Sequence, residues 1–238
     1  FRVANSPRVS VTGCAVHGRT DYGLHVVNSV SAHFDSCLMY GTHKQAVYFE
    51  SCDSINSLAM MVAGSSERAA KLLRCNDGYF MRLTIQSGPK RGLVLDHSAN
   101  CFIDSLQVVN VHSDTAVGVL LDSAPNSAFR WAMLYGDYGT AIRVDRSSGS
   151  RFAHARLHGT AADAAMAISQ SSGVSVQPCS LVCNTPVSIV LGDSCNDDTL
   201  ARVTMLGTTR TGITAVNCRG LVVANSCIKG WNDFGVAL

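Results

Sequence analysis

Small residues followed by alternating apolar and polar positions recur along the whole chain at intervals of about 23 residues. The residue that opens each alternation is Gly, Ala or Ser, and successive openers are 23, 23, 23, 26, 23, 24, 23, 24 and 23 residues apart. The openers are Gly23, Ala46, Ala69, Gly92, Gly118, Ala141, Ala165, Ser188, Gly212 and Gly235. A fixed period of roughly 20–50 residues is the signature of a repeat architecture.

Each repeat carries the pattern of three short strands. The positions one and three residues after the opener are apolar in all ten repeats, as Leu24 and Val26 are in the first. Alternation with period two is typical of a strand with one buried face. Two more apolar columns predict a second strand, beginning at Val16, and a third strand, beginning at Val11, and Gly, Ser, Asn and Asp separate them.

A repeat of this size cannot bury its apolar side chains alone and must stack on its neighbours. Like residues then form columns about 4.8 Å apart, the spacing of paired strands. We therefore expect an all-β, right-handed parallel β-helix (a solenoid), with about ten coils of 23–24 residues forming one domain over residues 1–238. A β-propeller blade needs about 40 residues, which the period excludes.

The arrangement resembles the right-handed parallel β-helix of the pectin-lyase-like superfamily, and most closely the central domain of a phage tailspike or tail-fibre protein. The resemblance covers essentially the whole chain and is one of architecture, because no catalytic motif of the superfamily matches. The chain opens on Phe1 rather than Met, and both ends fall inside the repeat. We expect it to be part of a longer protein whose end caps lie elsewhere.

The amino-acid composition limits the classes of binding partner that we expect. Charged residues make up 15% of the chain and the net charge is +2, which argues against a nucleic-acid partner because such proteins usually carry a basic stripe. No run approaches the roughly 18 apolar residues of a membrane span, so no membrane contact is expected. The start of the chain does not have the pattern of a signal peptide.

Ten cysteines follow the repeat, with Cys14 above Cys37 and Cys52 above Cys75, and the spacing places Ser194 farther along the column of Cys52. In a stack they behave as small apolar residues, and parallel side-by-side Cβ vectors favour stacking over a disulfide. We expect mostly free thiols, which suits folding in a reducing cytosol. No Cys-x-x-Cys pair with matching His spacing occurs, so we expect no metal and no other cofactor.

A column of carboxylates gives the sharpest indication of chemistry. Four residues after their openers lie Glu50, Asp96, Asp122 and Asp145, the last three in consecutive coils. Carboxylates about 5 Å apart repel and should raise one another's pKa. Adjacent coils fit the spacing of retaining glycosidases, and alternate coils fit that of inverting ones. These four residues are the catalytic candidates, with one Asp as general acid and another as base or nucleophile.

Two other interpretations of this column stay open. Asp is also a common turn residue, and Arg143 or Arg146 can neutralise Asp145 by a surface ion pair. Arg143 beside Asp145 also allows a lyase, because in pectate lyases, which this architecture resembles, external Asp residues hold Ca²⁺ and an Arg acts as base. The chain lacks that family's longer motifs, and a single Asp column offers few oxygen ligands for Ca²⁺.

Substrate-binding candidates lie outside the predicted core. Arg143, Tyr48 and Tyr135 are outward positions of the repeat, and tyrosine rings can stack on sugars. The longest insertion, near residues 111–115, carries His112 and Asp114, and such loops often hold the binding function of a solenoid. Further aromatic candidates are Tyr40, Tyr138, Trp131 and Trp231. For Trp131, core packing beside Phe129 explains the position equally well.

The outward side of the second strand is apolar, which usually indicates a covered surface. It includes Leu38, Tyr40, Met61, Val109, Met133, Tyr135, Val182 and Leu206. The resemblance to tailspikes implies a homotrimer or contacts with other virion tail proteins. We expect a tailspike-like protein of the virion tail, assembled in the host cytoplasm, that binds host surface polysaccharide and, in the enzymatic version, cleaves it.

Two alternatives belong to other functional classes. One is a non-catalytic structural or adhesive β-helix module, and the other is a secreted polysaccharide lyase or epimerase. The choice of a tailspike rests on analogy of fold, and function depends on the site rather than on the fold.

Overall fold

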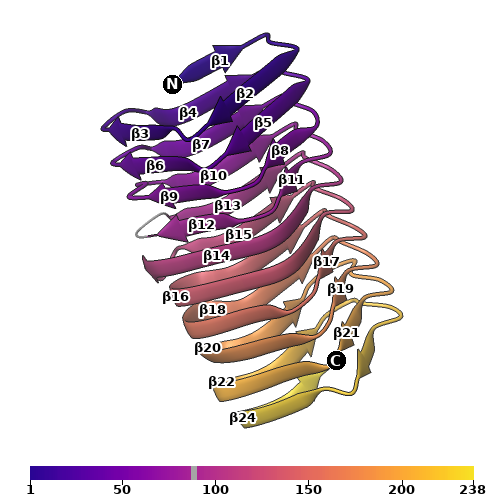
Figure 1. The fold of residues 1–238 in the computed structure, drawn as a ribbon. Coiled ribbons are helices and arrows are strands. Elements are labelled where there is room, and N and C mark those ends of the chain that lie inside the picture. Colours follow the sequence, from indigo (N-terminus) through magenta and orange to yellow (C-terminus); the bar gives the residue numbers. More distant parts are fainter. Residues whose placement is uncertain (87–89) are drawn as a thin grey trace.

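The computed structural model describes residues 1–86 and 90–238, apart from the side chains of Asn110 and Thr208. The protein is an all-β parallel solenoid of about ten turns (Figure 1). The coils follow one another from the N-terminal end of the stack to β24 at the opposite end (Figure 1). The strands of the described residues are β1 (Arg2–Ala4), β2 (Arg8–Thr12), β3 (Ala15–Gly18), β4 (Tyr22–Val27), β5 (Ser31–Asp35), β6 (Cys37–Gly41), β7 (Gln45–Glu50), β8 (Ile55–Ser57), β9 (Met60–Ala63), β10 (Arg68–Leu73), β11 (Tyr79–Phe80), β12 (Leu83–Gln86), β13 (Arg91–Asp96), β14 (Phe102–His112), β15 (Val117–Asp122), β16 (Ala128–Asp145), β17 (Arg151–Phe152), β18 (Ala155–Ser169), β19 (Ser175–Val176), β20 (Cys179–Leu191), β21 (Thr199–Ala201), β22 (Val203–Ala215), β23 (Val222–Ala224) and β24 (Cys227–Ala237).

Three faces run along the stack, and each is a parallel ladder. Face 1 contains β1, β4, β7, β10, β13, β15 and the C-terminal parts of β16, β18, β20, β22 and β24. Face 2 contains β2, β5, β8, β11, the first residues of β14 and β16, and then β17, β19, β21 and β23. Face 3 contains β3, β6, β9, β12 and the intervening parts of the long strands.

The predicted register is confirmed on all three faces. Leu24 aligns with Val47 on face 1, Val11 aligns with Phe34 on face 2, and Val16 aligns with Met39 on face 3. The apolar columns fill one continuous core. Its largest fully buried side chains include Phe34, Phe49, Phe80, Phe129 and Phe152. Buried columns of this kind give each coil its stability through its neighbours rather than through contacts of its own.

The short strands of the repeat merge in the second half of the chain. The separate strands β3 and β4 have 4 and 6 residues, whereas β16 continues for 18 residues across all three faces. The corner between faces 3 and 1 is then a bend inside the ladder, at Gly136 (φ 146°) and Gly159 (φ 139°). A Cβ on Gly159 would overlap the carbonyl oxygen of Gly136, so this corner needs glycine for the close approach of the two backbones.

A tight left-handed turn follows face 1 in almost every coil. The residues with positive φ at this corner are Asn5, Asn28, Ser51, Arg74, His97, Ser123, Arg146, Gln170 and Asn217. Such φ values are uncommon outside glycine and favour Asn. Coil-to-coil hydrogen bonds support them here, as when the Asn28 N–H donates to the Glu50 carbonyl oxygen at 2.9 Å. The turn holds long side chains such as Arg74 and Arg146 at the edge of face 1.

All ten cysteines are free, and seven of them are buried, which confirms the prediction of stacked thiols. The Cys52 N–H donates to Sγ of Cys75 at 3.4 Å. Burial raises the pKa of Cys101 and Cys179 to about 11, so these thiols stay protonated. Farther along the Cys52 column, the sequence pattern predicts Ser194, but Cys195 occupies that position and Ser194 forms the turn with φ 62°.

Candidate functional site

The predicted carboxylate column exists. Glu50, Asp96, Asp122 and Asp145 end their strands of face 1 in one register, with Leu73 between the first two. Each of the four carboxylates, however, has a cation of its own. The pairs are Arg74 with Glu50 at 2.7 Å, Lys71 with Asp96 at 2.7 Å, Arg146 with Asp122, and Arg143 with Asp145 at 2.9 Å.

The left-handed corner supplies two of these cations. Arg74 and Arg146 lie one coil beyond the carboxylates that they contact, because the turn directs their side chains back along the column. Arg143 pairs with Asp145, as the surface-turn interpretation expects, but Arg146 pairs with Asp122 rather than with Asp145. The charge of the column is therefore balanced coil by coil.

The expectation of mutually raised carboxylate pKa values is wrong for Asp96. Burial acts to raise the pKa of Asp96, but the hydrogen bonds from Lys71 and His97 outweigh burial and hold the pKa below its ordinary value. Nδ1 of His97 lies 2.7 Å from Oδ1 of Asp96. A carboxyl group with a lowered pKa is ionised at neutral pH, so this environment does not favour Asp96 as a general acid.

Tyr48 is an outward residue of face 1, but only 8% of it is exposed. Its ring is stacked with Tyr22 and His25, with centroids 5.5 and 5.0 Å away. Burial and the nearby charge of Glu50 raise the pKa of Tyr48 to about 12. Little of the ring is left to contact a sugar.

The other predicted binding residues lie in separate places. His112 ends β14 and Asp114 lies in the insertion between β14 and β15, after a bulge that shifts the register beyond Val109. Nδ1 of His112 is 2.9 Å from Oδ2 of Asp137, and Asp114 is exposed. Tyr135 is exposed on face 3. The structure does not bring these residues to the carboxylate column, which lies at the far end of face 1.

The aromatic candidates separate clearly by burial. Tyr138 is only 2% exposed, and its hydroxyl donates to the Val108 carbonyl oxygen at 3.5 Å, so its prediction as a surface residue is wrong. Trp131 is 39% exposed and stacks on His154, with ring centroids 4.1 Å apart and an interplanar angle of 16°. Its indole is therefore a surface platform rather than part of the core.

Trp131 lies at the corner between faces 2 and 3, between two hollows. The first hollow, of about 450 Å³, lies before Trp131 in the stack and its lining includes Met61 and Arg82. The second, of about 230 Å³, lies after Trp131 and its lining includes Arg156 and Arg202. Residues from one column of face 3 line both hollows. In order along the stack, this column contains Leu38, Met61, Thr84, Gln107, Met133, Arg156, Ser180 and Thr204. We call this line of two hollows with Trp131 between them the corner groove.

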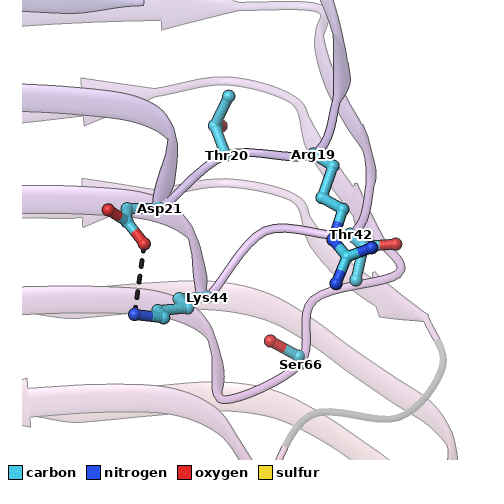
Figure 2. A pocket seen from close by; sticks show the side chains of 6 residues that line it. All are labelled: Arg19, Thr20, Asp21, Thr42, Lys44 and Ser66. Atoms are coloured by element: carbon cyan, nitrogen blue, oxygen red, sulfur yellow. Dashed lines mark ion pairs between the residues drawn. The ribbon is translucent and has the colours of Figure 1, made fainter.

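A different hollow of about 470 Å³ lies at the corner between faces 3 and 1, near the N-terminal end. Figure 2 shows Asp21 and Lys44 pointing toward each other across it, at 3.2 Å. The neighbouring hollow of this corner contains Glu67 and Arg68, which are 4.0 Å apart. These pairs partly compensate the positive charge that Arg19, Lys90 and Arg91 bring to this corner.

No protein-family model matches the chain, and no curated protein matches it. Within residues 1–86 and 90–238 the structure has no group of three or more His, Cys, Asp or Glu side chains placed to hold a metal ion. The same residues form no helix that is long and apolar enough to span a membrane.

Proposed function

We propose that the chain is a polysaccharide-binding β-solenoid module of the tailspike type, which holds an extended surface polysaccharide along the corner groove. The observation that carries the proposal is the exposed Trp131 ring, stacked on His154 between two hollows in one register. A tryptophan ring offers a large, rigid apolar face for the C–H groups of a sugar. Stacking on His154 fixes that face at the surface.

The shape of the groove fits an extended polymer. Five coils separate the centres of the two hollows, at Met61 and Ser180, which corresponds to about 24 Å at the spacing of paired strands. Thr84 lines the first hollow, and Ser180 and Thr204 line the second. Their hydroxyl groups can donate to and accept from sugar hydroxyls.

Binding without cleavage is the better supported version. The four carboxylates lie at another corner, and each is neutralised by a cation. The wider tailspike setting, a homotrimer in a virion tail, stays a prediction from the resemblance. The exposed Tyr40, Tyr135 and Leu206 on face 3 support it, because apolar side chains gathered on one face often mark a contact with a partner.

Trp131→Ala is expected to weaken polysaccharide binding at least about tenfold, as the loss of a central aromatic contact does in other interfaces. Affinity electrophoresis through gels that contain bacterial surface polysaccharides measures this effect. Trp231→Ala is the matched control, because Trp231 is also exposed but belongs to the final coil. Failure of the wild-type chain to bind any polymer, or equal losses in both variants, would overturn the proposal.

A depolymerase is the second candidate, favoured by the three carboxylates in adjacent coils. Under the binding proposal, Asp122→Asn leaves polymer retention unchanged and lowers the free energy of unfolding by less than about 1 kcal/mol, because its ion pair with Arg146 is exposed. Size-exclusion chromatography of the polymer and urea unfolding of the protein measure the two effects. A wild-type chain that shortens the polymer, together with an Asp122→Asn variant that does not, would make the column the active site.

A further inference from the structure

Three arginines of the corner groove pair with no carboxylate of residues 1–86 and 90–238. Arg82 lines the first hollow, and Arg156 and Arg202 line the second. All three arginines are exposed, and none of the ion pairs among the described residues includes them. Neither hollow has an Asp or Glu in its lining. This contrasts with face 1, where Arg143 and Arg146 are held by carboxylates.

The three arginines lie at unequal intervals along the stack. Three coils separate Arg82 from Arg156, and two more separate Arg156 from Arg202. At the spacing of paired strands these intervals are about 14 and about 10 Å. Trp131 lies between the first two, one coil before His154. The order along the groove is therefore cation, aromatic ring, cation, cation.

Exposed arginines without carboxylate partners are suited to binding anionic groups of a ligand. Its planar guanidinium group binds carboxylate, sulfate or phosphate with two parallel hydrogen bonds, which are stronger than hydrogen bonds between neutral groups. A neutral polysaccharide would leave the three guanidinium groups in water and gain little from them. An anionic polysaccharide with charged groups at intervals along its chain would gain charge-assisted bonds at both hollows.

We infer that the corner groove binds an anionic polysaccharide, with charged groups of the polymer seated on Arg82 and on Arg156 and Arg202 while Trp131 supports a sugar ring between them. The inference rests on the proposed function and specifies the class of its ligand. A single-stranded nucleic acid is also anionic, but proteins that bind it offer several aromatic platforms for successive bases. The groove has one exposed indole, so we favour the polysaccharide.

The test is affinity electrophoresis of the full chain at low and at moderate salt. The probes are polygalacturonate, its carboxyl-reduced derivative, polysialic acid, dextran sulfate, neutral dextran and the bacterial polymers of the previous experiment, with an oligothymidylate for comparison. We expect at least one anionic polymer to retain the protein and dextran not to do so. Affinity should fall about tenfold as salt screens the charges, and carboxyl reduction should abolish binding of polygalacturonate if that polymer is retained.

Arg156→Gln and Arg202→Gln are each expected to weaken retention about tenfold, the loss of one charge-assisted contact. Arg219→Gln is the matched control, because Arg219 is an exposed arginine at the turn between faces 1 and 2 and should leave retention unchanged. All three substitutions are at exposed positions, so circular dichroism should show the same fold as the wild type.

The outcomes separate this inference from the proposed function. Salt-insensitive binding of a neutral polymer, unaffected by the arginine variants, overturns the anionic ligand and leaves polysaccharide binding intact. No retention by any polysaccharide overturns both. Preferential retention by the oligothymidylate, lost in Arg156→Gln, assigns the groove to nucleic acid and also overturns both.

Discussion

Phe129→Ala is expected to lower the free energy of unfolding by about 3–5 kcal/mol, the usual range for deleting a buried aromatic ring. Phe129 is 1% exposed, and its ring stacks on Phe152 with centroids 4.9 Å apart and an interplanar angle of 9°. The deletion leaves a void in the column where neighbouring coils support each other. Urea unfolding followed by far-UV circular dichroism measures the loss.

Phe102→Ala is the control for this deletion. Phe102 lies outside the core on face 2, where its ring stacks on Tyr79 with centroids 5.6 Å apart. As a cross-strand pair at the surface it should contribute about 1 kcal/mol or less. A Phe129→Ala loss no larger than that of Phe102→Ala would show that the face 2 column does not form the core as described.

Asp198 should make the protein less stable as the pH rises. The residue is 1% exposed; Oδ1 accepts the Val174 N–H at 2.8 Å, and Oδ2 has no hydrogen-bond partner among the described residues. Burial, with the nearby charge of Asp197 adding to it, raises the pKa of Asp198 from 3.8 to about 6 in spite of that hydrogen bond. The folded chain therefore binds this proton more tightly than the unfolded chain does.

The resulting contribution to stability is complete below about pH 3.8 and is lost as the pH rises through about 6. The pKa difference corresponds to about 3 kcal/mol. Asp198→Asn removes this term, so the difference in unfolding free energy between variant and wild type should change by about 2–3 kcal/mol in favour of the variant between about pH 4 and pH 7.5. Urea unfolding across this range measures it.

Both chains share every other titrating group, so those effects cancel in the difference. One example is His25, whose pKa is lowered by burial and by the nearby Arg2. Asp163→Asn is the matched control, because it removes a carboxylate from an exposed position of β18 that does not contribute to the pKa of Asp198, and it should change the difference by less than about 0.5 kcal/mol. A pH-independent difference for Asp198→Asn would contradict the burial of an ionisable carboxyl group at this position.

The columns of the fold could be predicted because the sequence repeats them. Apolar residues two apart, such as Leu24 and Val26, predict a strand, and the step of about 23 residues aligns that strand with the next. The merging of strands around the corner at Gly136 could not be predicted, because glycine is typical both of turns and of bends inside a ladder. Spacing alone likewise placed Ser194 where the structure has Cys195.

The candidate site could be predicted from the sequence less completely than the fold. The position of the carboxylates follows from the repeat, but their neutralisation depends on the left-handed turn, which directs Arg146 to Asp122. A sequence pattern does not show where a long side chain of such a turn points. Trp131 by itself does not predict the corner groove, because core packing beside Phe129 explains its position in the sequence equally well. Aligning the corner column would have placed Arg82, Trp131, His154 and Arg202 in one line.

The spacing of the coils sets the distances between the cations of the corner groove in steps of one coil. Each coil between Arg82 and Arg156 adds about 4.8 Å to their separation, and every coil repeats the same columns. Duplication or loss of one 23-residue unit there would shift the two hollows by one step and leave the core register intact. Under the proposed function, variants with more or fewer coils would select polymers whose charged groups recur at longer or shorter intervals, so the number of repeats would set the periodicity of the ligand.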